Sequence, residues 1–108
     1  MENQIIRITP EVSQKYILAK ISDNDQILLW GNPNIEWHKD IAAEMESSGL
    51  TISEVSGGGK VKIITIPKTI YVWGKSSVYG EAPFQDIEII LKRAYPSHLI
   101  LNETPPEE

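Results

Sequence analysis

Cysteine is absent from this sequence of 108 residues, and its absence excludes several kinds of chemistry. Without thiols the chain can form no disulfide, no cysteine-ligated zinc site and no cysteine nucleophile of the kind that some phosphatases use. Histidine is scarce as well. Only His38 and His98 are present, and their spacing forms no metal-ligand pattern. We therefore expect no metal and no other cofactor.

Long apolar segments are missing too. No run approaches the roughly eighteen apolar residues that a membrane-spanning helix needs, so we expect no membrane partner. The first four residues are polar, and the short apolar run behind them is interrupted by Arg7, which predicts no secretion signal. The sequence is therefore expected to be that of a cytoplasmic protein.

Basic residues are the minority among the charges. Ten lysines and arginines face fifteen acidic residues, which gives a formal net charge of −5. A general nucleic-acid binder needs a basic face to displace counterions, so no nucleic-acid partner is expected. Hydrophobic residues make up 41% of the chain, a globular composition. We predict one domain at residues 1–102, a disordered acidic tail at 103–108, and a monomer.

The order of apolar patterns predicts the fold. Residues 15–21 alternate, which is typical of a half-buried strand with Lys15 at the rim of the sheet, its ammonium at a pocket mouth. Residues 26–30 show no alternation and predict a strand covered on both faces. Further strands are predicted at 4–8 (an edge strand), 51–55, 61–66, 69–73 and 98–101. Together with two helices, this predicts an α+β fold in which two α-helices pack on a single mixed β-sheet of about six strands.

Both helices have clear boundaries in the sequence. The first is predicted to begin at the N-cap candidate Asn34 and to end before Gly49, with an apolar stripe at Trp37, Ile41 and Met45. The second lies between Pro83 and Pro96, with its stripe at Phe84, Ile87, Ile90, Leu91 and Ala94.

His38 is the residue around which we expect the chemistry to be organised. It would lie in the first turn of the first helix, beside the apolar stripe, where unpaired backbone N–H groups and the positive end of the helix dipole point outward. A neutral imidazole can accept and return a proton near pH 7. A lone histidine near a helix start is nevertheless more often structural. We expect His98, at the start of the last strand, to be structural or solvent-exposed.

Two glycine-rich stretches follow. Ser56-Gly57-Gly58-Gly59-Lys60 is not a nucleotide-binding P-loop, because Glu54 stands where that motif needs its first glycine and Val61 follows the lysine. It is either a flexible connection between strands or a site of close backbone approach that places Lys60 beside an anion. Residues 74–80 form a loop whose N–H groups and serine hydroxyls could hold an anion, although loops of this composition are common.

Taken together, these stretches resemble the phosphohistidine phosphatase (janus/ocnus) family. The resemblance runs from about Lys15 to Pro96. It rests on four segments in the family's order and spacing, with the end of the second helix (Lys92 to Pro96) also similar. The segments are Lys15-Tyr16-Ile17-Leu18, Trp37-His38-Lys39-Asp40-Ile41, Gly57-Gly58-Gly59-Lys60 and Ser76-Ser77-Val78-Tyr79-Gly80.

The resemblance implies a metal-independent hydrolase that removes phosphate from phosphohistidine-containing proteins. The family's catalytic histidine corresponds to His38, its phosphate-binding lysine to Lys15, and its anion-holding loop to residues 76–78. The expected phosphate-binding residues are thus Lys15, Lys60, Ser76, Ser77 and Val78, with Trp37, Lys39 and Tyr79 as possible walls of the pocket. Animal members carry arginine where this chain has Lys60.

Three alternatives stay open at the level of sequence. His38 could activate a water molecule as a general base, or it could carry the phosphoryl group itself in a covalent intermediate. The same pocket could belong to a non-catalytic module that binds phosphate or another anion. The domain could also serve only protein interaction or structure.

Overall fold

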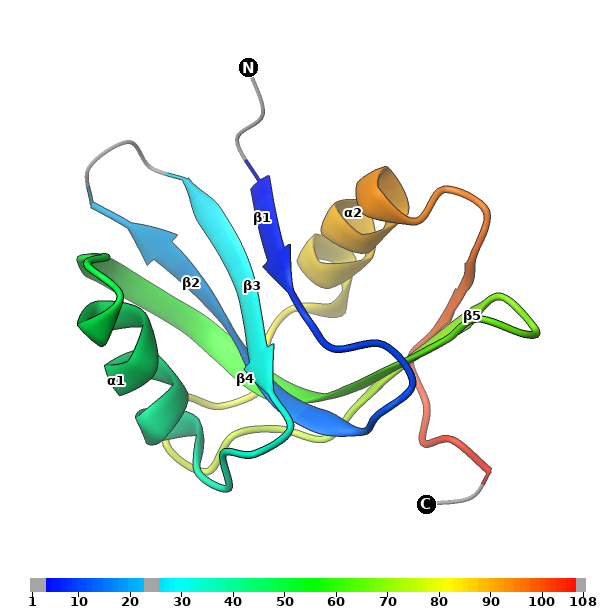
Figure 1. Ribbon diagram of the computed structural model, residues 1–108, viewed down its shortest axis with the longest axis horizontal. Helices are drawn as coiled ribbons and strands as arrows, with labels where there is room; N and C mark the ends of the chain where they lie inside the picture. Colours follow the sequence, from blue (N-terminus) through cyan, green and yellow to red (C-terminus); the bar gives the residue numbers. More distant parts are fainter. Residues whose placement is uncertain (1–3, 23–25, 107–108) are drawn as a thin grey trace.

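One mixed β-sheet with a helix on each face forms the protein, which is therefore an α+β fold (Figure 1). The computed structural model describes residues 4–22 and 26–106. The six strands lie in the order β1-β3-β2-β4-β5-β6; the outer pairs β1–β3 and β5–β6 are parallel and the other pairs antiparallel. The elements are β1 (Gln4–Arg7), β2 (Gln14–Ile21), β3 (Ile27–Asn32), α1 (His38–Ser47), β4 (Ile52–Ile64), β5 (Thr69–Trp73), α2 (Phe84–Ala94) and β6 (Leu99–Leu101).

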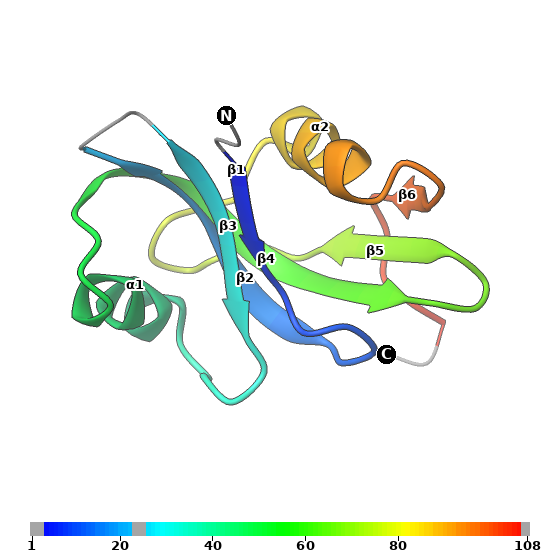
Figure 2. The same cartoon turned by 45° about the horizontal axis from the view of Figure 1, so that its top comes forward.

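Two separate apolar clusters hold the helices against opposite faces of the sheet (Figure 2). On one face, Ile87 and Leu91 of α2 pack against side chains such as Leu18 and Val72. On the other face, Ile41 and Met45 of α1 pack against a cluster that includes Ile17. Because successive residues of a strand point to opposite faces, neighbouring residues of β2 belong to different clusters.

Strand β2 departs from the prediction. Its alternation suggested one buried face, but Tyr16, Ile17, Leu18 and Ala19 are all buried because a helix covers each side. The interpretation as a half-buried strand was wrong. The prediction that the strand at residues 26–30 is covered on both faces is confirmed, since Leu28 and Leu29 of β3 belong to different clusters. Strand β1 lies at an edge of the sheet, as expected.

Helix α1 begins later than predicted. Its N-cap is Trp37 and its first residue is His38, so Asn34 is not the cap. The buried face of α1 carries His38, Ile41 and Met45, whereas Trp37 lies outside the helix with 54% of its surface exposed. The predicted end is confirmed. Gly49 follows the C-cap with φ 98°, and its N–H donates to Glu46 O, as in a glycine-terminated helix.

Helix α1 is also anchored by polar contacts to β3. The carboxylate of Glu44 accepts a hydrogen bond from Trp30 Nε1 and another from Asn32 Nδ2, both at 2.9 Å. These two bonds join the middle of the helix to the end of the strand. They limit rotation of the helix about its axis, and so they help to fix where its first residue, His38, can lie.

The glycine triplet is part of a strand and not a loop between two strands. Strand β4 runs through it without a break from Ile52 to Ile64. Against β2, Leu18 pairs with Gly57 and Ala19 with Val55, which leaves Ser56 as one extra residue in a β-bulge. The pattern of small residues had suggested a connection because glycine weakens a strand.

In the C-terminal part of the chain, helix α2 agrees with the prediction. Helix α2 begins after Pro83 and buries Ile87, Ile90 and Leu91. His98 is half-buried just before β6, where its Nε2 lies 3.1 Å from Ile64 O. Within the predicted tail the structure describes residues 103–106, of which Pro105 is buried. The last two residues of the predicted tail lie outside the described residues.

Candidate functional site

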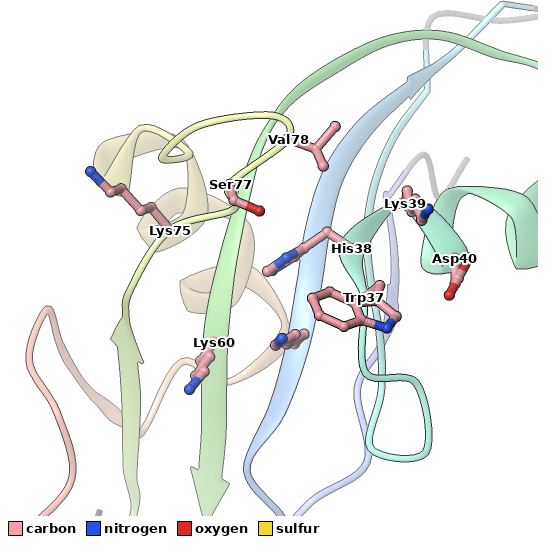
Figure 3. A pocket seen from close by; sticks show the side chains of 9 residues that line it. Trp37, His38, Lys39, Asp40, Lys60, Lys75, Ser77 and Val78 are labelled. Carbon is pink, nitrogen blue, oxygen red and sulfur yellow. The ribbon is translucent and has the colours of Figure 1, made fainter.

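A cavity of about 690 Å³ opens on the α1 side of the sheet, where α1 begins (Figure 3). Its lining comes from four separate parts of the chain: β2, the start of α1, β4 and the loop after β5. Its size falls in the usual range for small-ligand pockets, about 300–1,000 Å³. The lining residues are Lys15, Trp37, His38, Lys39, Asp40, Lys60, Lys75, Ser77 and Val78.

The imidazole of His38 lies against the glycines of β4. Its Nε2 is 3.0 Å from Gly59 O. A carbonyl oxygen only accepts hydrogen bonds, so the neutral imidazole carries its proton on Nε2 and keeps the lone pair on Nδ1. One backbone contact thus selects the tautomer and leaves a single ring nitrogen as the base.

The middle glycine of the triplet is required by this packing. A Cβ atom at Gly58 would lie 2.9 Å from His38 Cδ2 and 2.6 Å from the carbonyl oxygen of Tyr16, both closer than real side chains approach. At Gly57 a Cβ atom would lie 2.5 Å from the backbone nitrogen of Ala82. The triplet therefore lets the histidine on one face and the segment before α2 on the other come close to the strand.

The surroundings of His38 favour its neutral form. Burial lowers its pKa below the usual 6.5, and the nearby ammonium groups of Lys15 and Lys60 lower it further, while the hydrogen bond with Gly59 acts in the opposite direction. The net effect is a lowered pKa, so His38 is uncharged at neutral pH. A neutral, buried imidazole with a free lone pair can accept a proton.

Positive charge is concentrated around this imidazole. Lys15 and Lys60 are direct partners across strands β2 and β4, and Lys39 and Lys75 line the same cavity. Against these four lysines stands one acidic lining residue, Asp40. In a chain with a net charge of −5, such a collection of like charges is unfavourable unless an anion joins it.

Lys15 is held in place more firmly than a free surface lysine. Its Nζ donates a hydrogen bond to Glu36 O, and it lies 5.4 Å from the centre of the Trp37 ring. Both partners belong to the segment that leads into α1. The structure places Lys15 in the lining of the cavity.

The N-terminus of α1 adds a second source of positive potential. Its N-cap, Trp37, makes no side-chain capping bond to the helix. The first N–H groups of an α-helix have no partner within the helix, and the helix dipole favours negative charge at this end. Because His38 and Lys39 are the first two residues of α1 and line the cavity, this end of the helix meets the lysines there.

The loop at 74–80 contributes less directly than the sequence suggested. Ser77 and Val78 line the cavity, but Ser76 and Tyr79 are not among its lining residues. The buried Ser76 hydroxyl accepts hydrogen bonds from the N–H groups of Val78 and Tyr79, at 3.1 and 3.0 Å. Ser76 therefore shapes the loop from inside, while the half-buried Tyr79 packs against the apolar cluster under α1.

Most of the predicted site residues meet in this one cavity. Lys15, Lys60, His38, Ser77 and Val78 come together there, with Trp37 and Lys39 as walls. Two lining residues were not predicted as part of the site, although both lie within motifs that the sequence displays: Asp40 in the histidine motif and Lys75 in the loop.

Within residues 4–22 and 26–106, no group of three or more histidine, aspartate or glutamate side chains is placed to hold a metal ion. No helix in that part of the chain combines the length and the apolar character needed to cross a membrane.

Comparisons with known proteins identify the family of this chain. The family model described as the Janus/Ocnus family matches residues 2–99, which include every residue of the cavity lining. The sex-regulated protein janus-A of Drosophila melanogaster is 28% identical over 103 residues, a match that covers 89% of this chain and 76% of that protein. Janus-A of Drosophila yakuba is 29% identical over the same length and with the same coverage.

Proposed function

Because this chain belongs to the Janus/Ocnus family, we propose that it is a metal-independent phosphohistidine phosphatase that uses His38 as its general base. Its substrates would be proteins that carry phosphohistidine. One observation supports this proposal above all others: a buried imidazole with a lowered pKa shares a cavity with four lysines and an uncapped helix N-terminus.

The lysines and the helix are suited to hold a phosphoryl dianion. Phosphoryl transfer needs positioning and stabilisation of charge on the phosphoryl oxygens more than it needs covalent help from the protein. Lys15 and Lys60 lie side by side in the sheet, and the first two residues of α1, His38 and Lys39, line the same cavity. These groups would supply the positive charge that other phosphatases obtain from metal ions.

His38 would then activate the attacking water. In this step Nδ1 accepts a proton from the water as its oxygen forms a bond to phosphorus. The P–N bond breaks, its electron pair stays on the leaving imidazole nitrogen, and that nitrogen takes a proton from solvent. His38 then releases the proton on Nδ1 to solvent and returns to its neutral form. The products are inorganic phosphate and histidine. Anion binding alone would not need a neutral imidazole, and this favours the enzyme over a simple binding module.

The test is release of inorganic phosphate from a peptide that contains phosphohistidine, with excess EDTA in the assay. We expect turnover that EDTA does not reduce. Loss of activity on chelation, with recovery on addition of a divalent metal, would contradict the metal-independent mechanism. Binding of phosphate without turnover would instead identify a non-catalytic anion-binding module.

The covalent alternative can be separated in the same assay. If His38 carried the phosphoryl group, rapid quenching during turnover would trap a phosphorylated form of the enzyme. With His38 as a general base we expect no such species above the background given by His38→Gln. Accumulation of phospho-His38 at a rate that matches turnover would overturn this mechanism.

A further inference from the structure

The cavity is larger than a phosphoryl group requires, and two of its nine lining residues are apolar. Two lining residues leave large apolar side chains open to solvent: Trp37 is 54% exposed and Val78 is 60% exposed. Burial of such surface is favourable, so a ligand that covers it gains affinity. In the view of Figure 3 the His38 imidazole lies between Trp37 and Val78, and all three residues line the cavity.

The position of Trp37 beside the cavity is set by its backbone and by Lys15. Trp37 is the N-cap of α1 and directly precedes His38, so the helix and the sheet determine where its backbone lies. The Lys15 ammonium lies 5.4 Å from the centre of its ring, and Lys15 itself is bonded to Glu36 O. Within the part of the chain that the structure describes, no aromatic side chain is recorded as stacking on the indole of Trp37.

We propose that Trp37 binds the imidazole of the substrate and makes the site selective for phosphohistidine over phosphorylated aliphatic amines. This inference rests on the proposed function, since it assigns the ring of the substrate to the same cavity. The phosphoryl group of the substrate would lie at the lysines and the start of α1, and the imidazole ring of the substrate would lie on the indole. Val78 would cover the ring from the loop after β5.

The physical basis is the difference between a flat ring and an alkyl chain. An imidazole can stack on an indole and exclude water from both surfaces, and a protonated ring gains an additional cation–π attraction. The alkyl chain of a phospholysine gains apolar contact but no stacking. Aromatic pairs of this kind correspond to a preference between about twofold and tenfold.

The experiment measures binding of two non-hydrolysable phosphonates with equal charge. One carries a five-membered azole ring next to the phosphonate, and the other an alkyl chain of similar length. We expect the wild type to prefer the azole by up to about tenfold, and Trp37→Ala to reduce the preference to twofold or less. Trp37→Tyr should keep most of the preference, whereas Trp37→Leu should lose it although it retains apolar bulk.

Ile89→Ala provides the matched control. Ile89 is exposed to the same degree as Trp37, at 53%, but lies on α2 away from this cavity. Its substitution should leave both affinities unchanged. Inorganic phosphate serves as the reference ligand. If a substitution of Trp37 disturbs Lys15, the affinities for phosphate and for both phosphonates change alike. The ratio of the two phosphonate affinities is then unaffected.

The outcomes separate the two proposals. An azole preference that Trp37→Ala leaves intact, or a wild type without any preference, would overturn the role of Trp37 while the phosphatase proposal stands. A Trp37-dependent preference without hydrolysis of phosphohistidine peptides would support the ring site and contradict the phosphatase. A wild type that binds neither phosphonate nor inorganic phosphate would contradict both.

Discussion

Substitution of Gly58 by alanine is the sharpest test of how strand β4 supports the site. The added Cβ would lie 2.6 Å from Tyr16 O and 2.9 Å from His38 Cδ2. The carbonyl of Tyr16 belongs to the neighbouring strand β2, so it cannot move without disturbing the sheet. Relief of the contact with Tyr16 O requires a shift of β4 against β2, and relief of the contact with Cδ2 displaces the imidazole, which would weaken the hydrogen bond between Nε2 and Gly59 O.

The expected loss has two components. Overpacking of a well-packed site costs about 1–3 kcal/mol, so we expect the melting temperature to fall by several degrees. Displacement of a catalytic group by about 1 Å can lower turnover about 100-fold. We therefore expect a folded but less stable Gly58→Ala protein with a much larger loss of activity than of stability.

Gly49→Ala is the matched control. Gly49 has φ 98° and no atom within 4 Å of an added Cβ, so alanine there causes left-handed strain of about 1–2 kcal/mol without a clash. It lies at the far end of α1 from His38, and its effect on turnover should be slight. Phosphate release and thermal melting, measured on all three proteins, separate the effects. Wild-type turnover in Gly58→Ala would refute the reasoning that β4 positions His38.

Other predictions follow from the same geometry. His38→Gln keeps a donor for Gly59 O and should lower turnover about 10²- to 10⁴-fold, as seen by phosphate release, with a melting curve close to that of the wild type; near-normal turnover would exclude His38 as the base. Lys15→Met should raise KM more than it lowers kcat, because an ammonium beside the phosphoryl group binds ground and transition states alike; steady-state kinetics that show a collapse of kcat alone would assign Lys15 a different role. Lys60→Arg should bind phosphate within about 1–2 kcal/mol of the wild type and Lys60→Ala more weakly, as measured by amide NMR titration; unchanged binding in Lys60→Ala would place Lys60 outside the binding site. Because burial lowers the pKa of His38 from 6.5, kcat/KM should hold steady as the pH falls to 6.5 and decline only below it, which a pH–rate profile checks. The free energy of unfolding should also decrease below pH 6.5, because the unfolded chain there binds a proton that the folded chain does not. Denaturant titrations at several pH values measure this decrease.

Much of the fold could be predicted because its signals are local. Helix α2 has an apolar stripe between two prolines, and Gly49 ends α1 where a glycine is expected. Residues 61–66 and 69–73 are rich in β-branched and aromatic residues, which favours strands. The start of α1 was misplaced because Asn34 resembles an N-cap in sequence. In the structure Trp37 takes the cap position, and the carbonyl of Glu36 before it accepts a hydrogen bond from Lys15 Nζ.

The candidate site could be predicted as a set of residues and not as an arrangement. The motifs identify His38, Lys15, Lys60 and the loop, and these do share one cavity apart from Ser76 and Tyr79. The role of Ser76 inside its own loop depends on the turn that brings two N–H groups to its hydroxyl. No spacing in the sequence shows which way that hydroxyl points.

The sequence by itself determined the class of fold, the limits of the second helix and the residue types available for chemistry. Apolar periodicity, helix-bounding prolines and composition are all properties of short segments. The tertiary structure decided the rest. It joined the two predicted strands around Gly57–Gly59 into one, since close packing of His38 against Gly58 can be seen only when α1 lies on the sheet. It also set the tautomer and the lowered pKa of His38, because both depend on Gly59 O, on burial and on two lysines that the pairing of β2 with β4 brings together.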